Sequence, residues 1–110
     1  MKVYLCVQSE YEGSEAFRAC KSEKKAQYIV TQVNRLLNVH KELRKLSQTQ
    51  SLKYWNNNPQ LIDSTKIEIY YHSEEWKKIN KLMKKIDNLL EIFGANSFYR
   101  TAHVEEKRLE

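Results

Sequence analysis

Apolar residues recur at intervals of three and four from Ser73 to Gly94, and this periodicity constrains the fold more than any other feature of the sequence. Ser73 is a typical N-cap, because its hydroxyl can accept a hydrogen bond from a free backbone N–H group, and Gly94 is typical of the position after a helix. The apolar positions are Trp76, Ile79, Leu82, Met83, Ile86, Leu89, Leu90 and Phe93. We predict an amphipathic helix whose apolar face packs into the core.

A second helix is predicted at residues 23–47, after the N-cap Ser22. Its apolar residues keep helical spacing without an intervening Gly or Pro: Ala26, Ile29, Val30, Val33, Leu36, Leu37, Leu43 and Leu46. At about 1.5 Å per residue this helix is roughly 37 Å long, which exceeds what a short sheet can cover. We therefore expect its far end to protrude, bend or meet a partner.

Alternating residues predict a hairpin at the start of the chain. Residues 2–8 read as a strand in which one face carries Val3, Leu5 and Val7. A polar connection at 9–14 leads to a second strand at 15–20, and we expect Phe17 and Ala19 to point inward.

Two more strands are predicted, one on each side of the helix between Ser73 and Gly94. Residues 65–71 alternate, with Thr65, Ile67, Ile69 and Tyr71 on one face, and residues 97–104 form the fourth strand. Residues 47–63 are predicted to be a long loop, which Trp55 fixes against the body. The resulting order ββαβαβ predicts an α+β fold, a mainly antiparallel four-stranded sheet with two helices on one face.

The length of 110 residues predicts a single domain over residues 1–108, with Leu109-Glu110 read as a cloning scar. Hydrophobic residues make up 41% of the chain, which argues against global disorder. No apolar run approaches the roughly 18 residues that a membrane span needs, and no signal peptide is recognisable. We therefore expect a cytoplasmic protein that does not interact with membranes.

Residues that carry chemistry are few and scattered. The hairpin can bring Cys6 and Cys20 together, but the absence of an export signal favours free thiols. Three histidines, His40, His72 and His103, show no ligand spacing, so we expect neither a metal nor a cofactor. His40 lies within the apolar stripe of the first helix, which is typical of a packed, hydrogen-bonded histidine. Without a nucleophile or phosphate-binding motif, the chain is predicted not to be an enzyme.

The net charge of +5 is concentrated in one segment, because residues 21–48 contain seven basic and two acidic residues. Such a segment can neutralise phosphates, although lysines opposite an apolar stripe occur on any solvent-exposed helix. The candidates for nucleic-acid contact are Lys24, Lys25, Lys77, Lys81 and Lys84, and on the first helix also Lys41, Arg44 and Lys45.

Aromatic residues exceed what one small core can enclose, and exposed Tyr and Trp often mark protein contact sites. Together with the basic end of the first helix they predict a partner-binding surface. Its candidate residues are Tyr54, Trp55, Arg35, Lys41, Arg44 and Lys45.

Residues 1–5 and the segment Phe17–Ile29, joined by a short acidic-aromatic turn, resemble small uncharacterised phage and mobile-element proteins. In those proteins a hairpin leads into a helix that starts with Ser/Thr-x-x-x-Ala, here Ser22 to Ala26. Some anti-CRISPR and other anti-defence inhibitors have a similar layout and size. The resemblance implies no catalytic residue. Because many inhibitors that mimic DNA are acidic and this chain is basic, it implies an inhibitor that covers a protein surface.

These observations favour a small non-catalytic protein-binding domain that acts through a protein partner or its own dimer. A phage-encoded inhibitor of a host defence protein, of the anti-CRISPR type, is the specific form that the resemblance implies. The alternative is a nucleic-acid-binding module that uses the basic first helix.

Overall fold

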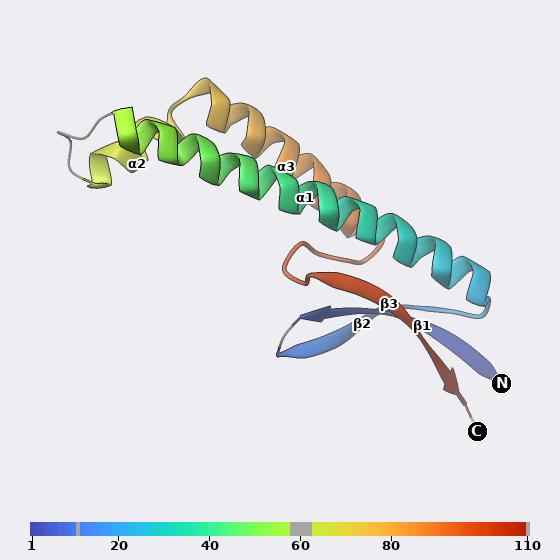
Figure 1. The fold of residues 1–110 in the computed structure, drawn as a ribbon. Coiled ribbons are helices and arrows are strands. Elements are labelled where there is room, and N and C mark those ends of the chain that lie inside the picture. Colours follow the sequence, from blue (N-terminus) through green and yellow to red (C-terminus); the bar gives the residue numbers. More distant parts are fainter. Residues whose placement is uncertain (11, 58–62, 110) are drawn as a thin grey trace.

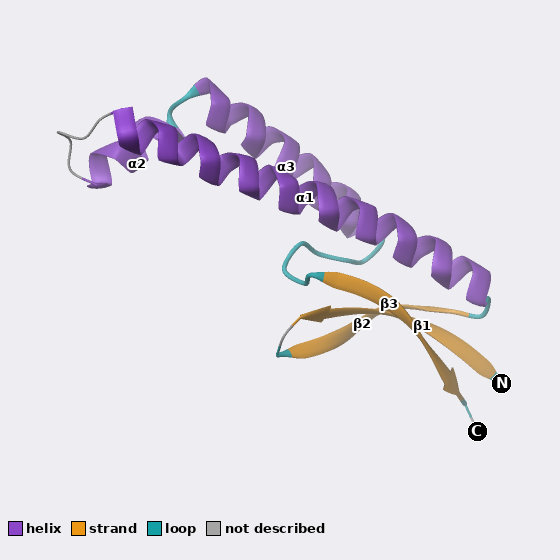
Figure 2. Ribbon diagram, in the orientation of Figure 1, coloured by secondary structure: helices purple, strands orange, loops and turns teal. Residues whose placement is uncertain are grey.

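The computed structural model describes residues 1–10, 12–57 and 63–109 of the chain. Within these ranges the protein is an α+β domain, in which three helices lie on one side of a three-stranded antiparallel sheet of order β2-β1-β3 (Figures 1 and 2). The elements in chain order are β1 (Lys2–Glu10), β2 (Gly13–Cys20), α1 (Glu23–Asn57), α2 (Asp63–Tyr71), α3 (Glu74–Ile92) and β3 (Thr101–Arg108).

The predicted ββαβαβ order, with a four-stranded sheet and two helices, is wrong. Residues 65–71, expected to form a strand, belong to α2, where the buried residues Lys66 and Tyr70 are one helical turn apart and Ile67 and Ile69 are exposed. The alternation in this segment is too short to distinguish a period of two from a helical period. Packing of α2 against α1 and α3 selects the helix.

The predicted loop at 47–63 is wrong where the structure describes it, because α1 continues through most of that segment. No Gly or Pro occurs between Gly13 and Pro59, so no residue of this kind interrupts the helix. The part at 58–62 lies outside the described residues. Trp55, expected to hold a loop against the body, lies on α1, and the Lys66 ammonium is 4.6 Å from its ring centre.

The last strand begins later than predicted, at Thr101 instead of residue 97. The preceding residues are held in a turn by Asn96, whose side-chain oxygen accepts a hydrogen bond of 2.9 Å from the Phe98 N–H. Such an Asx turn competes with strand pairing. β3 then pairs with β1 along its whole length, from Thr101 opposite Ser9 to Arg108 opposite Lys2.

The helix predicted between Ser73 and Gly94 is confirmed as α3. The Ser73 hydroxyl accepts a hydrogen bond of 3.2 Å from the Trp76 N–H, as an N-cap does. Gly94 follows the helix with a φ of +83°, which favours glycine, and a Cβ there would lie 3.1 Å from the Phe17 carbonyl oxygen. The N-cap at Ser22 is also present at the start of α1, since its hydroxyl accepts from the Lys25 N–H at 3.3 Å.

The face of β1 that packs against the helices carries Tyr4, Cys6 and Gln8. The opposite face, with Val3, Leu5 and Val7, contributes no residue to the core cluster beneath the helices, although Val7 is itself buried. In the neighbouring strand, the expected inward orientation is correct for Phe17 and wrong for Ala19. The register shifts at an irregularity between Cys6 and Val7, and Ala19 pairs with Leu5 on the outer face.

Two side-chain amides join the helical layer and the loop before β3 to the sheet. Asn34 of α1 accepts a hydrogen bond from the Ala102 N–H at 2.8 Å and donates one to the Ala102 carbonyl at 2.9 Å. Gln8 of β1 makes the same pair of bonds with the backbone of Asn96, at 3.0 and 2.9 Å. Because β3 is an edge strand, Asn34 satisfies backbone groups that have no further strand to pair with.

The helical layer extends well beyond the sheet. The molecule measures 66 × 25 × 15 Å, and its radius of gyration is 18.5 Å, whereas a compact chain of this length has about 13 Å. We use the term arm for residues 44–57 of α1, all of α2, and residues 74–83 of α3. In the arm, α3 runs back along α1 without a sheet beneath it (Figure 1). The protrusion expected for the first helix is therefore present.

His40 links α1 to α3 at the base of the arm. Its side chain is 7% exposed, and Nε2 lies 3.3 Å from a carboxylate oxygen of Asp87. Nδ1 has no hydrogen-bond partner among the described residues. Burial lowers the pKa of His40 below 6.5; the Asp87 carboxylate opposes this shift and the Arg44 guanidinium adds to it. His40 is thus a packed histidine, as predicted, and its lowered pKa keeps it neutral at pH 7.

Replacing Asn34 by Ala removes both hydrogen bonds to the backbone of Ala102, which is buried. We expect the free energy of unfolding in urea to fall by about 2 kcal/mol, the cost of leaving a buried polar group without a partner. Asn38→Ala changes an exposed amide one turn further along the same helix and is the control, expected within about 0.5 kcal/mol of the wild type. Equal losses in the two variants would contradict the role of Asn34.

Stability is expected to fall as the pH drops below 6.5, because the unfolded chain then binds a proton at residue 40 that the folded chain resists. Well above pH 6.5 the imidazole of residue 40 is neutral in both the folded and the unfolded chain, so the pH no longer changes the free energy of unfolding through this residue. His40→Leu should remove the pH dependence between 6.5 and about 5.5, where carboxylates are still largely ionised. Unfolding free energies measured across that range test this, with His72→Leu, at an exposed position, as the control. A wild-type slope retained in His40→Leu would refute it.

Candidate functional site

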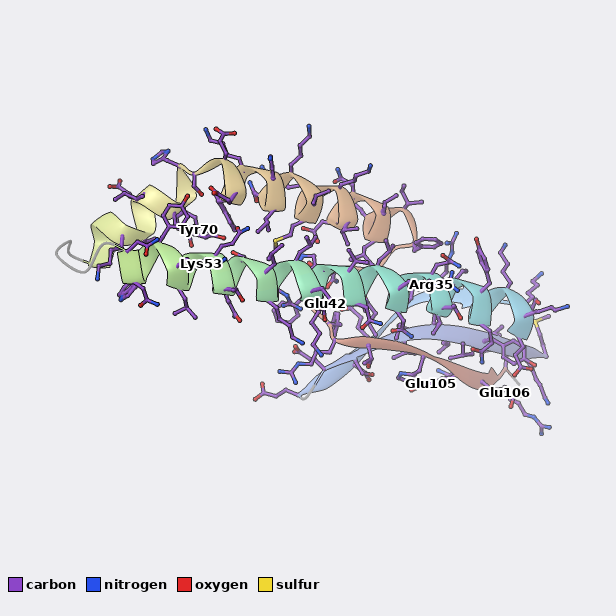
Figure 3. The ribbon with its side chains drawn as sticks, turned by 45° about the horizontal axis from the view of Figure 1, so that its top comes forward. Arg35, Glu42, Lys53, Tyr70, Glu105 and Glu106 are labelled. Atoms are coloured by element: carbon purple, nitrogen blue, oxygen red, sulfur yellow. The ribbon has the colours of Figure 1, made fainter. Side chains whose placement is uncertain are left out.

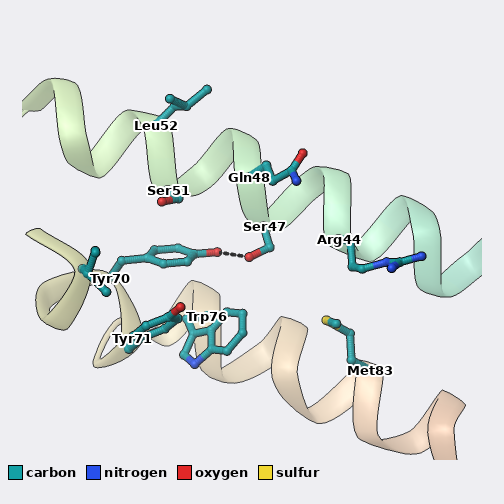
Figure 4. Close-up of a pocket in the computed structure, with 10 residues that line it drawn as sticks. Arg44, Ser47, Gln48, Ser51, Leu52, Tyr70, Tyr71, Trp76 and Met83 are labelled. Carbon is teal, nitrogen blue, oxygen red and sulfur yellow. Dashed lines mark hydrogen bonds between the residues drawn. The ribbon is translucent and has the colours of Figure 1, made fainter. Parts of the chain in front are cut away.

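A groove of about 620 Å³ lies on the arm between α1, α2 and α3 (Figure 4). It is the larger of two hollows that meet along α1. Its lining residues are Arg44, Ser47, Gln48, Ser51, Leu52, Ile67, Tyr70, Tyr71, Trp76 and Met83. A volume of this size is within the usual range for ligand and peptide sites, about 300 to 1,000 Å³.

The groove exists because the inward-facing residues of α1 become smaller and polar where the helix enters the arm. Over the sheet its buried positions are occupied by residues such as Val33 and Leu37, whereas in the arm Ser47 and Ser51 line the groove. These hydroxyl side chains are too small to fill the space between two helices, and a void remains. α2 closes the end of this space with Tyr70.

Tyr70 forms the most enclosed part of the groove. It is 4% exposed, and its hydroxyl lies 2.9 Å from the Ser47 hydroxyl and donates to Gln50 Oε1 at 3.4 Å. Figure 4 shows its ring pointing from α2 toward α1, with Trp76 beside it. These hydrogen bonds satisfy the buried hydroxyl and fix the ring, so this part of the wall is rigid.

Around Tyr70 the aromatic rings form a continuous cluster. Ring centres are 5.5 Å apart for Tyr54 and Tyr70, 5.6 Å for Tyr70 and Trp76, and 5.0 Å for Tyr71 and Trp76. The rim stays open to solvent, since Tyr71 is 51% exposed, Ile67 43% and Leu52 62%. Solvent-exposed apolar groups next to a rigid aromatic wall are typical of a contact surface.

A second hollow, of about 540 Å³, continues the groove toward the sheet. It is lined by Leu37, Asn38, Lys41, Arg44, Tyr99, Arg100 and Thr101. Arg44 lines both hollows, so the two adjoin along α1, and we use the term trough for both together. The trough is aromatic at the arm end and cationic at the sheet end, and none of the described residues that line it is acidic.

Two carboxylates next to tyrosines of this region accept hydrogen bonds from them. Glu75 accepts from the Tyr54 hydroxyl at 2.8 Å, and this bond raises the pKa of Tyr54. Glu15 accepts from the Tyr99 hydroxyl at 2.7 Å and raises its pKa in the same way. By contrast, Lys41, Arg44 and Arg100 form no ion pair with any described residue.

The two cysteines, Cys6 and Cys20, are buried in the core and are not joined by a disulfide bond. Burial, together with the neighbouring Cys20 thiol, raises the pKa of Cys6 to about 11, so its thiol is protonated and unreactive at neutral pH. In the described part of the chain, no group of three or more His, Cys, Asp or Glu residues is arranged to hold a metal ion. The same part contains no helix with a stretch apolar and long enough to cross a membrane.

The predicted partner-binding residues separate into two sets. Lys41 and Arg44 line the trough, and Tyr54 belongs to the aromatic cluster beside it. The remaining three, Trp55, Arg35 and Lys45, do not line it; Trp55 contacts Lys66, and Lys45 lies 3.7 Å from Glu42. Figure 3 places Arg35 on the part of α1 over the sheet, far from Tyr70 at the end of the arm.

The lysines predicted to contact nucleic acid do not form one patch. Lys24 and Lys25 lie in the first turn of α1, whereas α3 starts beside the other end of α1 (Figure 1). Lys77, Lys81 and Lys84 are exposed along α3, and Lys77 lies 3.5 Å from Glu74. This distribution is that of the solvent-facing side of a helix.

Several groove residues were assigned other roles from the sequence. Ile67, Tyr70 and Tyr71 were expected in a strand, Trp76 and Met83 in the core, and Arg100 was not considered. One signal was present: the apolar stripe of the first helix is interrupted by Ser47 and Ser51, one turn apart. An interruption of this kind marks either a helix end or a gap in packing, and the structure shows the gap.

The comparisons with known proteins add no assignment to this geometry. No protein-family model matches the chain, and neither curated proteins nor solved structures match it. The site must therefore be interpreted from its own residues.

Proposed function

We propose that this protein is a non-catalytic protein-binding domain and that the groove on the arm is its docking surface. The observation that carries the proposal is the open, aromatic groove on a part of the molecule that extends beyond the sheet. Hot spots of protein interfaces are enriched in Trp, Tyr and Arg set in pockets, and Trp76, Tyr71 and Arg44 have this arrangement.

The lining of the trough supports binding in preference to catalysis. Neither hollow is lined by a described His, Cys, Asp or Glu, which are the usual acids, bases and nucleophiles. The buried thiols and His40 lie outside it and contact core or helix neighbours. The lining consists of apolar side chains, aromatic rings, and guanidinium and ammonium groups, which suit the binding of another molecule.

Two expectations from the sequence stay predictions. Inhibition of a host defence protein, which the resemblance of residues 1–29 implies, is one form that a protein-binding function can take. Nucleic-acid binding receives less support, because the basic residues proposed for it are distributed over α1 and α3 instead of forming one surface.

Ser51→Leu should separate folding from binding. A leucine at this position fills part of the groove with apolar side chain, and no hydrogen bond between the Ser51 side chain and another described residue is lost. We expect stability to be unchanged or higher by about 1 kcal/mol, while the docking surface is blocked. Quantitative mass spectrometry of proteins retained by immobilised wild type and variant, from extracts of the source cells, measures the loss of binding.

Thr49→Leu is the matched control for this experiment, because it makes a comparable change at an exposed position of α1 outside the groove. A partner that docks in the groove is retained by the wild type and Thr49→Leu and reduced at least tenfold with Ser51→Leu. Retention of the same proteins, at the same level, by all three chains would show that the groove is not the docking surface.

A further inference from the structure

We propose that the groove receives an acidic amphipathic helix of a different protein, an inference that rests on the proposed function. The helix would place apolar anchors against Tyr71 and Trp76 and its carboxylates beside Lys41, Arg44 and Arg100. Amphipathic helices bind in apolar grooves in this way, through anchors spaced at i, i+4 and i+7.

Charge complementarity identifies the occupant. The cationic half of the trough gathers three exposed basic residues with no ion pair to a described group, and no acidic residue is among the described side chains that line either half. Elsewhere on the same helices, Lys45 and Lys77 each lie within 4 Å of a carboxylate. Uncompensated like charges that line one surface attract an acidic segment and repel a basic one.

The dimensions of the trough agree with a short helix. On α1 its lining residues run from Leu37 to Leu52, which at about 1.5 Å per residue corresponds to roughly 22 Å. About four turns of a docked helix cover this length. One such segment provides two or three apolar anchors at the aromatic end and carboxylates at the cationic end.

A second copy of this chain is a poor occupant. The chain carries a net charge of +5, and its own amphipathic helix, α3, carries five lysines: Lys77, Lys78, Lys81, Lys84 and Lys85. Placing that helix in the trough would set these lysines against Lys41, Arg44 and Arg100, and like charges at an interface oppose association.

Trp76 allows occupancy of the groove to be measured directly. The chain contains two tryptophans, and Trp55→Phe leaves Trp76 as the only one. The probes are a designed 15-residue amphipathic peptide with Glu on its polar face, the same peptide with Lys in place of each Glu, and an oligothymidine. We expect the acidic peptide to shift the Trp76 emission and to bind about tenfold more tightly than the Lys peptide at low salt. The difference should shrink as salt is added.

Arg44→Glu tests the charge directly, and Arg35→Glu is its control. Both replace an exposed arginine of α1 and change the net charge equally, but only Arg44 lines the trough. Arg44→Glu should weaken binding of the acidic peptide about tenfold and strengthen binding of the Lys peptide, whereas Arg35→Glu should leave the preference unchanged.

The remaining outcomes distinguish this inference from the proposed function. Equal affinity for both peptides, abolished by Ser51→Leu, overturns the acidic occupant and leaves the groove as a docking surface. Displacement of the acidic peptide by oligothymidine overturns it in favour of nucleic acid. A dimer in analytical ultracentrifugation that Ser51→Leu dissociates overturns it in favour of a second copy. Failure of both peptides, with no groove-dependent retention from extracts, overturns the inference and the function together.

Discussion

The packing of one long helix against two different layers is the constraint on which the rest of the structure depends. Every other described element contacts α1. Over its first half the helix covers the sheet, where Asn34 also completes the hydrogen bonds of the edge strand. With 35 residues it is about 52 Å long, so it must leave the sheet behind. Beyond the sheet, α2 and α3 pack against α1. The arm therefore exists because α1 is longer than the sheet that it covers.

The candidate site is a consequence of the same arrangement. Two antiparallel helices and a short third one can enclose one aromatic side chain, Tyr70, but they leave its neighbours Tyr71 and Trp76 accessible. Where the sheet ends, the loop before β3 adds Arg100 to the basic residues of α1. A single trough thus combines an apolar wall with concentrated positive charge. The proposal that the protein is a binding domain is therefore supported by this chemistry alone.

Sequence patterns predicted the parts of the fold in which local and tertiary preferences agree. The first hairpin and α3 follow from periodicity, and the caps Ser73 and Gly94 act as their chemistry requires. Prediction failed for residues 65–71, where the alternation of Thr65, Ile67, Ile69 and Tyr71 occurs within a helix. Of the trough, Lys41 and Arg44 were predicted because they belong to one basic segment. The groove itself was not, since its walls come from segments that are distant in sequence.

What the sequence alone determined is therefore local: the hairpin, the start of α1, the whole of α3 and the excess of basic residues on the first helix. Tertiary structure decided which side of β1 packs against the helices, because alternation along a strand does not tell which face a helix will cover. It also decided that α1 continues to Asn57 and that Ser47 and Ser51 line a void. Periodicity can be read from residues that are neighbours in the sequence. A cavity depends on how closely side chains from separate elements pack, which the sequence pattern does not show.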